Sequence, residues 1–116
     1  MGEKNIQEIL HSLREIKGVH GAVLIEKLAG VVGEALPGWI DSDAISAMVN
    51  LILKVSQRAT KELEQGTFIS ATLENTNGKL LFSEVAGKII VVISTTEAKL
   101  GIIKLKLDAA KKALAG

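Results

Sequence analysis

Cysteine is absent from this chain of 116 residues, and the one proline is Pro37. Without cysteine the chain can form no disulfide, no thiolate nucleophile and no zinc site built on sulfur, a composition that suits a reducing compartment. Aromatic residues are scarce as well, because Trp39, Phe68 and Phe82 make up the whole set. The sequence therefore lacks the stacking surfaces on which RNA-binding and single-strand-binding modules hold bases.

A strong excess of one charge is also missing, since 14 basic and 13 acidic residues leave a net charge of +1. Proteins that follow a phosphate backbone need clustered cations, so we do not expect nucleic acid as a partner. The longest apolar runs, such as Ile89–Ile93, are far shorter than the ~20 residues of a membrane-spanning helix. The N-terminal charges recur at helical spacing and do not form a signal peptide. We therefore expect a cytoplasmic protein without membrane insertion.

Hydrophobic residues form 47% of the chain and charged residues 23%, which predicts a packed core rather than disorder. The length fits a single domain over residues 1–116. The hydrophobic pattern predicts an α+β fold in the order α-β-β-α-β-β-β-α, with a five-stranded antiparallel sheet and helices on its faces. The expected elements are a helix around Ile6–Ile16, strands at Ala22–Glu26 and Val31–Leu36, a helix from Asp41 or Ser42 to about Gln65, strands at Thr67–Glu74, Lys79–Val85 and Lys88–Ser94, and a final helix.

The long helix and the last strand have the clearest signals. Asp41 or Ser42 can cap the start of the helix, and Gly66 is expected at the C′ position, where a left-handed residue ends many helices. The apolar run Ile89–Ile93 predicts a strand that is buried on both faces near the centre of the sheet.

The last segment can be interpreted as a strand or as a helix. Apolar residues alternate with lysines over residues 103–107, but residues 94–97 resemble a capping box and residues 108–115 strongly favour a helix, so we expect a helix. Glu97 and Asp108 dilute its basic face, which we interpret as solvated rather than as a site for an acidic partner or a membrane. The lysines of this face are Lys99, Lys104, Lys106, Lys111 and Lys112.

No motif for catalysis, metal binding or nucleotide binding can be assigned. Gly78-Lys79 and Gly87-Lys88 lack the hydroxyl and the upstream glycine of a phosphate-binding loop, so we interpret both as turns before strands. His11 and His20 lie on an expected helix and loop without a spacing that makes a metal site or a general base persuasive, so we interpret them as surface or boundary residues. We therefore predict a non-enzymatic protein with no catalytic residue, no metal site and no cofactor.

The long helix carries more apolar surface than one sheet can cover. At 100° per residue its apolar positions span an arc of about 200°, whereas packing on one sheet needs only about 100–140°. Either other elements of the chain cover the surplus or a partner does, and we favour a partner because large exposed apolar patches are rare on monomers. The interface residues predicted on this helix are Ala44, Met48, Leu51, Ile52, Val55 and Ala59.

The strand after this helix is uncharged in its first part and contains no proline. If it lies at an edge of the sheet, nothing in its sequence prevents another chain from adding a strand to it. A two-fold dimer would then pair this strand and this helix with their own copies. The interface residues predicted on this strand are Phe68, Ile69, Ser70, Ala71, Thr72 and Leu73.

The order of the elements and several local motifs resemble the roadblock, or dynein light-chain, domain family. The resemblance covers nearly the whole chain, although no single piece is a strict motif. The residues that carry it are Gly18-Val19-His20-Gly21-Ala22-Val23-Leu24-Ile25, Gly30, Pro37, the long helix, Gly78-Lys79-Leu80, Ile89–Ile93 and Leu100-Gly101-Ile102-Ile103-Lys104-Leu105.

The resemblance implies a profilin-like sandwich that dimerises through its second helix and third strand. Family members serve as dynein light chains, as scaffold subunits for small GTPases and, in bacteria, as activators of a Ras-like GTPase in polarity and gliding systems. We therefore expect a homodimer that regulates or scaffolds a small Ras-like GTPase, or a motor or polarity complex. The family binds no nucleotide and supplies no arginine finger, so any stimulation of hydrolysis would be indirect. The alternative is a small-ligand sensor domain with a pocket between sheet and helix.

Overall fold

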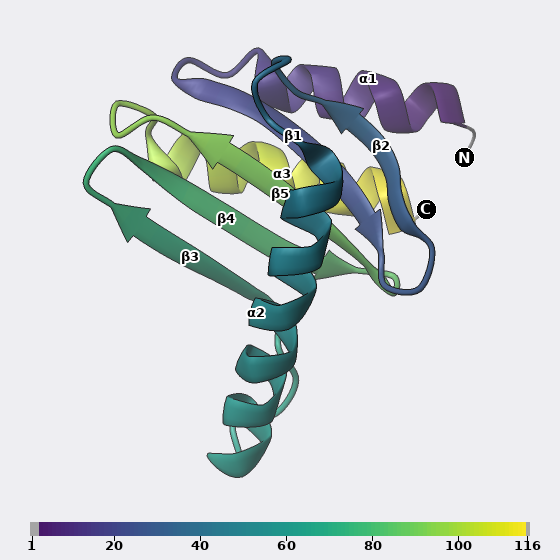
Figure 1. Cartoon of the computed structure of the whole chain (residues 1–116), viewed down its shortest axis with the longest axis vertical. Helices are drawn as coiled ribbons and strands as arrows, with labels where there is room; N and C mark the ends of the chain where they lie inside the picture. The colour runs from purple at the N-terminus through teal and green to yellow at the C-terminus, as the bar shows by residue number, and fades with distance from the viewer. Residues whose placement is uncertain (1–2, 116) are drawn as a thin grey trace.

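Residues 3–115, the part of the chain that the computed structural model describes, form three helices and a five-stranded antiparallel sheet (Figure 1). This architecture confirms the predicted α+β fold and the predicted order of elements. The elements are α1 (Glu3–Arg14), β1 (Val19–Glu26), β2 (Gly30–Ala35), α2 (Ser42–Glu62), β3 (Ser70–Asn75), β4 (Gly78–Val85), β5 (Lys88–Ser94) and α3 (Leu100–Ala115).

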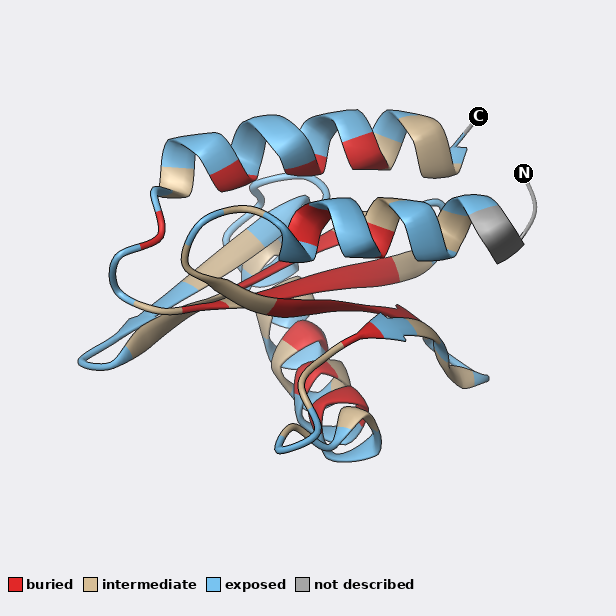
Figure 2. Ribbon diagram, turned by 90° about the horizontal axis from the view of Figure 1, so that it is seen from above, coloured by how far each residue is buried: buried red, intermediate tan, exposed pale blue. Residues whose placement is uncertain are grey.

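The sheet separates two layers of helix (Figure 2). α1 and α3 lie on one face, and α2 crosses the other face alone. Leu10 of α1, Leu24 of β1 and Ile103 of α3 are fully buried in the core under α1 and α3. Val49 of α2 and Phe82 of β4 belong to a second core, on the α2 side of the sheet.

The strand order β2-β1-β5-β4-β3 places β5 at the centre of the sheet and leaves β2 and β3 at its edges. Ile90 and Val92 point into the core under α1 and α3, while Ile89 and Val91 point into the α2-side core. All four are fully buried. The predicted central strand with two buried faces is therefore confirmed.

α2 begins as predicted and ends earlier than predicted. Asp41 is the N-cap, but the helix stops at Glu62 rather than near Gln65. Glu64 takes the left-handed conformation at C′, with φ 56°, in place of Gly66. The backbone N–H groups of Glu64 and Gln65 donate to carbonyls of the last turn at 3.1 and 2.9 Å, the pattern of a Schellman motif. These two backbone hydrogen bonds thus hold Glu64 in the left-handed conformation at the position where glycine was predicted.

The entry to β3 also differs from the prediction, because the strand begins at Ser70 rather than Thr67. The carbonyl of Ile69 accepts hydrogen bonds from the backbone N–H of Glu84 at 3.0 Å and from the hydroxyl of Ser83 at 3.2 Å. This forked contact fixes the chain just before the regular pairing of β3 with β4 starts.

The last segment is the predicted helix, and Ile103 and Leu107 of α3 are buried. The capping box does not form. The hydroxyl of Thr95 instead accepts a hydrogen bond from the backbone N–H of Glu97 at 3.2 Å, which makes a local turn before the helix starts at Leu100.

Candidate interaction surface

Five apolar residues form an exposed stripe along one side of α2, which we call the α2 stripe. Met48, Leu51 and Val55 keep 58%, 66% and 64% of their surface exposed, and the two alanines are exposed as well. The sixth residue predicted on this helix, Ile52, is half-buried and packs against the α2-side core. The members of the α2 stripe are Ala44, Met48, Leu51, Val55 and Ala59.

The α2 stripe is bare because the sheet uses a different arc of the helix. Ile45, Val49 and Leu53 point into the α2-side core. α2 has no other helix beside it on this face, and its C-terminal part extends past the sheet (Figure 1). Cover by other elements of the chain, the first of the two predicted alternatives, therefore does not occur for these five residues.

The edge formed by β3 is open to another strand. Its pairing with β4 is regular from Ser70 to Asn75, with no bulge, and it lies at the end of the strand order. The opposite edge is protected in two ways. β2 carries a bulge at Val32, where its register with β1 shifts, and the Gln7 amide donates to the carbonyl of Glu34 at 3.3 Å. Bulges and covered backbone groups discourage strand addition, so β3 is the edge that can accept a strand.

The residues predicted on the strand divide into two groups. Ser70 and Leu73 are exposed and Ala71 and Thr72 are half-buried, all on the edge strand. Phe68 differs from the prediction that it lies at an interface, because this residue is only 8% exposed and belongs to the core of the chain itself.

The segment that leads into β3 explains this difference. Phe68 stacks on Phe82, with 6.2 Å between the ring centroids. Neighbouring Ile69 lies outside the strand and is 65% exposed. Of these two neighbours, Ile69 therefore has its side chain free for a contact.

The α2 stripe and the apolar side chains of β3 lie on the same side of the sheet. Ala71 packs against the α2-side core, and Leu73 shares its face because side chains alternate along a strand. Leu80 of β4 and Ile93 of β5 are partly buried on this side too. One side of the sheet thus combines an apolar helix stripe, a partly exposed apolar floor and an open edge.

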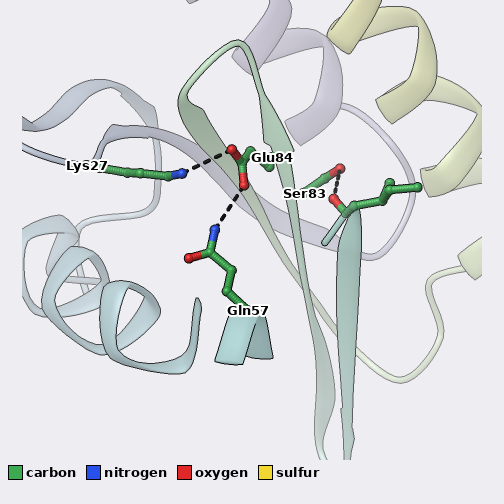
Figure 3. A network of polar contacts seen from close by, with 5 residues as sticks. Lys27, Gln57, Ser83 and Glu84 are labelled. Carbon is green, nitrogen blue, oxygen red and sulfur yellow. Dashed lines mark hydrogen bonds and ion pairs between the residues drawn. The ribbon is translucent and has the colours of Figure 1, made fainter. Parts of the chain in front are cut away.

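A small polar network holds α2 and the strands in place (Figure 3). One carboxylate oxygen of Glu84 pairs with Lys27 Nζ at 3.0 Å, and the other accepts a hydrogen bond from Gln57 Nε2 at 3.2 Å. Glu84 therefore connects β4 with α2 and with the turn between β1 and β2. Such connections position a binding surface before a partner arrives.

Other kinds of site find little support in the geometry. Within residues 3–115, no group of three or more His, Cys, Asp or Glu residues is placed to hold a metal ion. His20 packs edge-on against Trp39, with 5.1 Å between ring centroids. Two grooves lie between α1 and α3 rather than between the sheet and a helix, where a ligand-sensor pocket was expected. Across the described residues, no helix has the length and apolar character needed to cross a membrane.

Comparison with known proteins gives matches over most of the chain. The family model of the Roadblock/LC7 domain matches residues 5–95. Two uncharacterised proteins of Methanocaldococcus jannaschii, MJ0310 and MJ1340, are each 27% identical over 105 residues, which cover 90% of this chain and 92% of the relative.

Solved structures show the same fold at lower identity. Myxococcus xanthus MglB aligns with a TM-score of 0.90 and 17% identity, covering 97% of this chain and 86% of that chain. An MglB described in a tetrameric arrangement aligns with a TM-score of 0.84 and 23% identity, again covering 97% and 86% of the two chains. The helices and the sheet are therefore arranged as in these proteins.

Proposed function

The chain belongs to the Roadblock/LC7 domain family, and on that premise we propose that it is a non-enzymatic, homodimeric module that regulates or scaffolds a small Ras-like GTPase. One observation carries the proposal, namely that the exposed α2 stripe lies on the same side of the sheet as the open edge of β3. Large apolar patches and unpaired strand edges are features through which proteins bind other proteins.

The proposed dimer pairs β3 with its own copy in antiparallel fashion, which joins the two sheets into one. A two-fold axis through such a strand pair runs perpendicular to the sheet. Both copies of α2 then lie on the same side of the joined sheet, where their stripes can pack against each other. In this arrangement Ser70, Ala71, Thr72 and Leu73 supply the strand contact, with Ile69 beside it.

Self-association has support from a protein of the same fold, since an MglB has been described in a tetrameric arrangement. The GTPase partner has a different basis, which is the family itself. Its bacterial members activate a Ras-like GTPase, and other members serve as scaffold subunits for small GTPases. The same family basis leads us to propose a cytoplasmic setting for this chain.

Regulation of the GTPase would work through binding rather than through a catalytic side chain. The two arginines of the sequence are Arg14 and Arg58. Arg14 is the last residue of α1, and Arg58 lies on α2 with its Nε 3.8 Å from the carboxylate of Glu62. Both sit on regular helices rather than on a loop that could reach into another active site. We therefore propose that the bound dimer repositions the switch residues of the GTPase.

The test is binding to a small Ras-like GTPase from the same organism, loaded with GDP or with a non-hydrolysable GTP analogue. We expect calorimetry to detect binding to one nucleotide state more strongly than to the other, and GTP turnover to change in the same mixture. Leu28→Arg serves as a control variant, and we expect it to bind the GTPase as the wild-type chain does. Leu28 is 99% exposed in the turn between β1 and β2. If neither nucleotide state binds, the GTPase part of the proposal is wrong, whatever the oligomeric state of the chain.

A further inference from the structure

The helical layer opposite α2 presents a second surface, which we call the α1–α3 face. Two grooves with volumes of about 460 and 710 Å³ run between α1 and α3. Glu8 and Glu15 line the α1 wall, and Lys99 and Lys106 line the α3 wall. All four residues are exposed. An acidic row on one helix therefore faces a basic row on the other across a groove.

At one end of the larger groove the signs of the charges on the two walls are reversed. There Lys17, just after α1, lines one wall, and Glu97, just before α3, lines the other. In both grooves the charged residues of the two walls thus have opposite signs. Among residues 5–115, whose side chains the structure describes, no ion pair joins the two walls, so these charges have no partner across the groove in the single chain.

We propose that the α1–α3 face binds the same face of a second copy of this chain. α1 and α3 run in opposite directions side by side (Figure 2). A two-fold axis parallel to both helices places α1 of one copy against α3 of the other without shifting either along its length. Each acidic wall then meets a basic wall. Lys17 likewise meets Glu97 of the second copy.

The alternative two-fold arrangement, with the axis across the helices, brings like walls together and repels. The charge pattern therefore selects one orientation. This surface is independent of the α2 stripe, because it lies on the other side of the sheet.

Apolar residues add to the contact. Leu105 and Ile102 of α3 are 72% and 46% exposed on this layer, and exposed Ala109 lines the groove. A contact between two copies would remove part of this apolar surface from water, which favours association in either orientation, so the charges select the orientation.

The size of the face predicts a weak contact. α1 and α3 have 12 and 16 residues, so they are about 18 and 24 Å long at 1.5 Å per residue. Two helices about 10 Å apart offer roughly 400 Å² per copy, or roughly 800 Å² in total, below the usual range for a stable interface. We therefore expect association that is seen at high protein concentration and low ionic strength.

The test uses two charge-reversal variants and their mixture. Glu8→Lys with Glu15→Lys makes the acidic row basic, so that both rows are basic, and Lys99→Glu with Lys106→Glu makes both rows acidic; Lys17 and Glu97 stay unchanged in both variants. Sedimentation equilibrium at low salt should show self-association through this face weakened roughly tenfold or more in each variant alone. The equimolar mixture should recover it, because a basic face then meets an acidic one. Glu34→Lys with Glu64→Lys controls for net charge at exposed positions outside the face.

The measurement is made in the wild-type chain and in Leu51→Arg, so that its outcome does not depend on the α2 contact. In the first case the α1–α3 face would join dimers, and in the second it would join single chains. About 1 M salt, which shortens the Debye length to about 3 Å, should abolish the self-association through the α1–α3 face. The proposal is overturned if the mixture fails to recover what the two variants lost. It is also overturned if the wild-type chain shows no such association at low salt and high protein concentration. Sedimentation with vesicles of anionic lipid in that case would identify the face as a membrane contact instead.

Discussion

Leu51→Arg is the sharpest test of the α2 interface, because Leu51 is 66% exposed in the single chain. Complete burial of a leucine side chain is worth about 1.5–3 kcal/mol, so covering the exposed two-thirds contributes about 1–2 kcal/mol per copy. Symmetry doubles this contribution to about 2–4 kcal/mol per dimer, and arginine adds a buried charge without a partner. The dissociation constant of the dimer should therefore rise by about 30-fold to 1000-fold.

Sedimentation equilibrium measures this constant directly. The stability of the single chain should change by no more than about 0.5 kcal/mol, because the substituted side chain points into solvent. The midpoint of thermal unfolding should rise with protein concentration in the wild-type chain and lose that dependence in Leu51→Arg. Leu28→Arg, at a 99% exposed turn position, should behave as the wild-type chain does. A wild-type chain that is monomeric at micromolar concentration, or a variant that dimerises equally well, refutes the proposed interface.

Three further predictions test the fold that presents this surface. Leu53→Ala removes a side chain that is 2% exposed and should lower the free energy of unfolding by about 2–5 kcal/mol in urea, whereas Leu51→Ala should leave that of the single chain nearly unchanged. Gly18→Ala should cost more than Gly30→Ala in the same assay. Both glycines have positive φ, 87° and 86°, but a Cβ at Gly18 would lie 2.8 Å from backbone and one at Gly30 would meet nothing within 4 Å. Glu84→Gln weakens a partly exposed ion pair and should lower the free energy of unfolding by no more than about 1 kcal/mol. A larger loss would mean that the polar network in Figure 3 stabilises the fold more than a partly exposed ion pair usually does.

Much of the fold follows from local patterns in the sequence. The central position of β5 could be predicted because five consecutive apolar residues close to turn signals favour a strand with two buried faces. The α2 stripe could be predicted as well, since a helix with an apolar arc of about 200° has more such surface than one sheet covers. In both cases the order of apolar and polar residues along the chain is enough for the prediction.

The parts that could not be predicted depend on contacts between segments that are distant in the chain. Phe68 and Ile69 are both apolar, and the one that turns inward is the one that packs against Phe82 of β4 and the rest of the α2-side core. Whether the strand after α2 lies at an edge depends on the order of all the strands, which its own residues do not encode. The end of α2 at Glu62 has a different cause, since local backbone hydrogen bonds from Glu64 and Gln65 set it and the pattern of side chains does not encode them.

The contrast between the two edges of the sheet has a consequence for how large a strand-paired assembly can grow. When two copies pair through β3, both open edges are used up in the same contact, and the outer margins of the joined sheet are two copies of β2. The bulge at Val32 and the amide of Gln7 protect each of those margins. A third copy therefore finds no free strand to extend, and pairing through the sheet stops at two chains instead of continuing into a fibre.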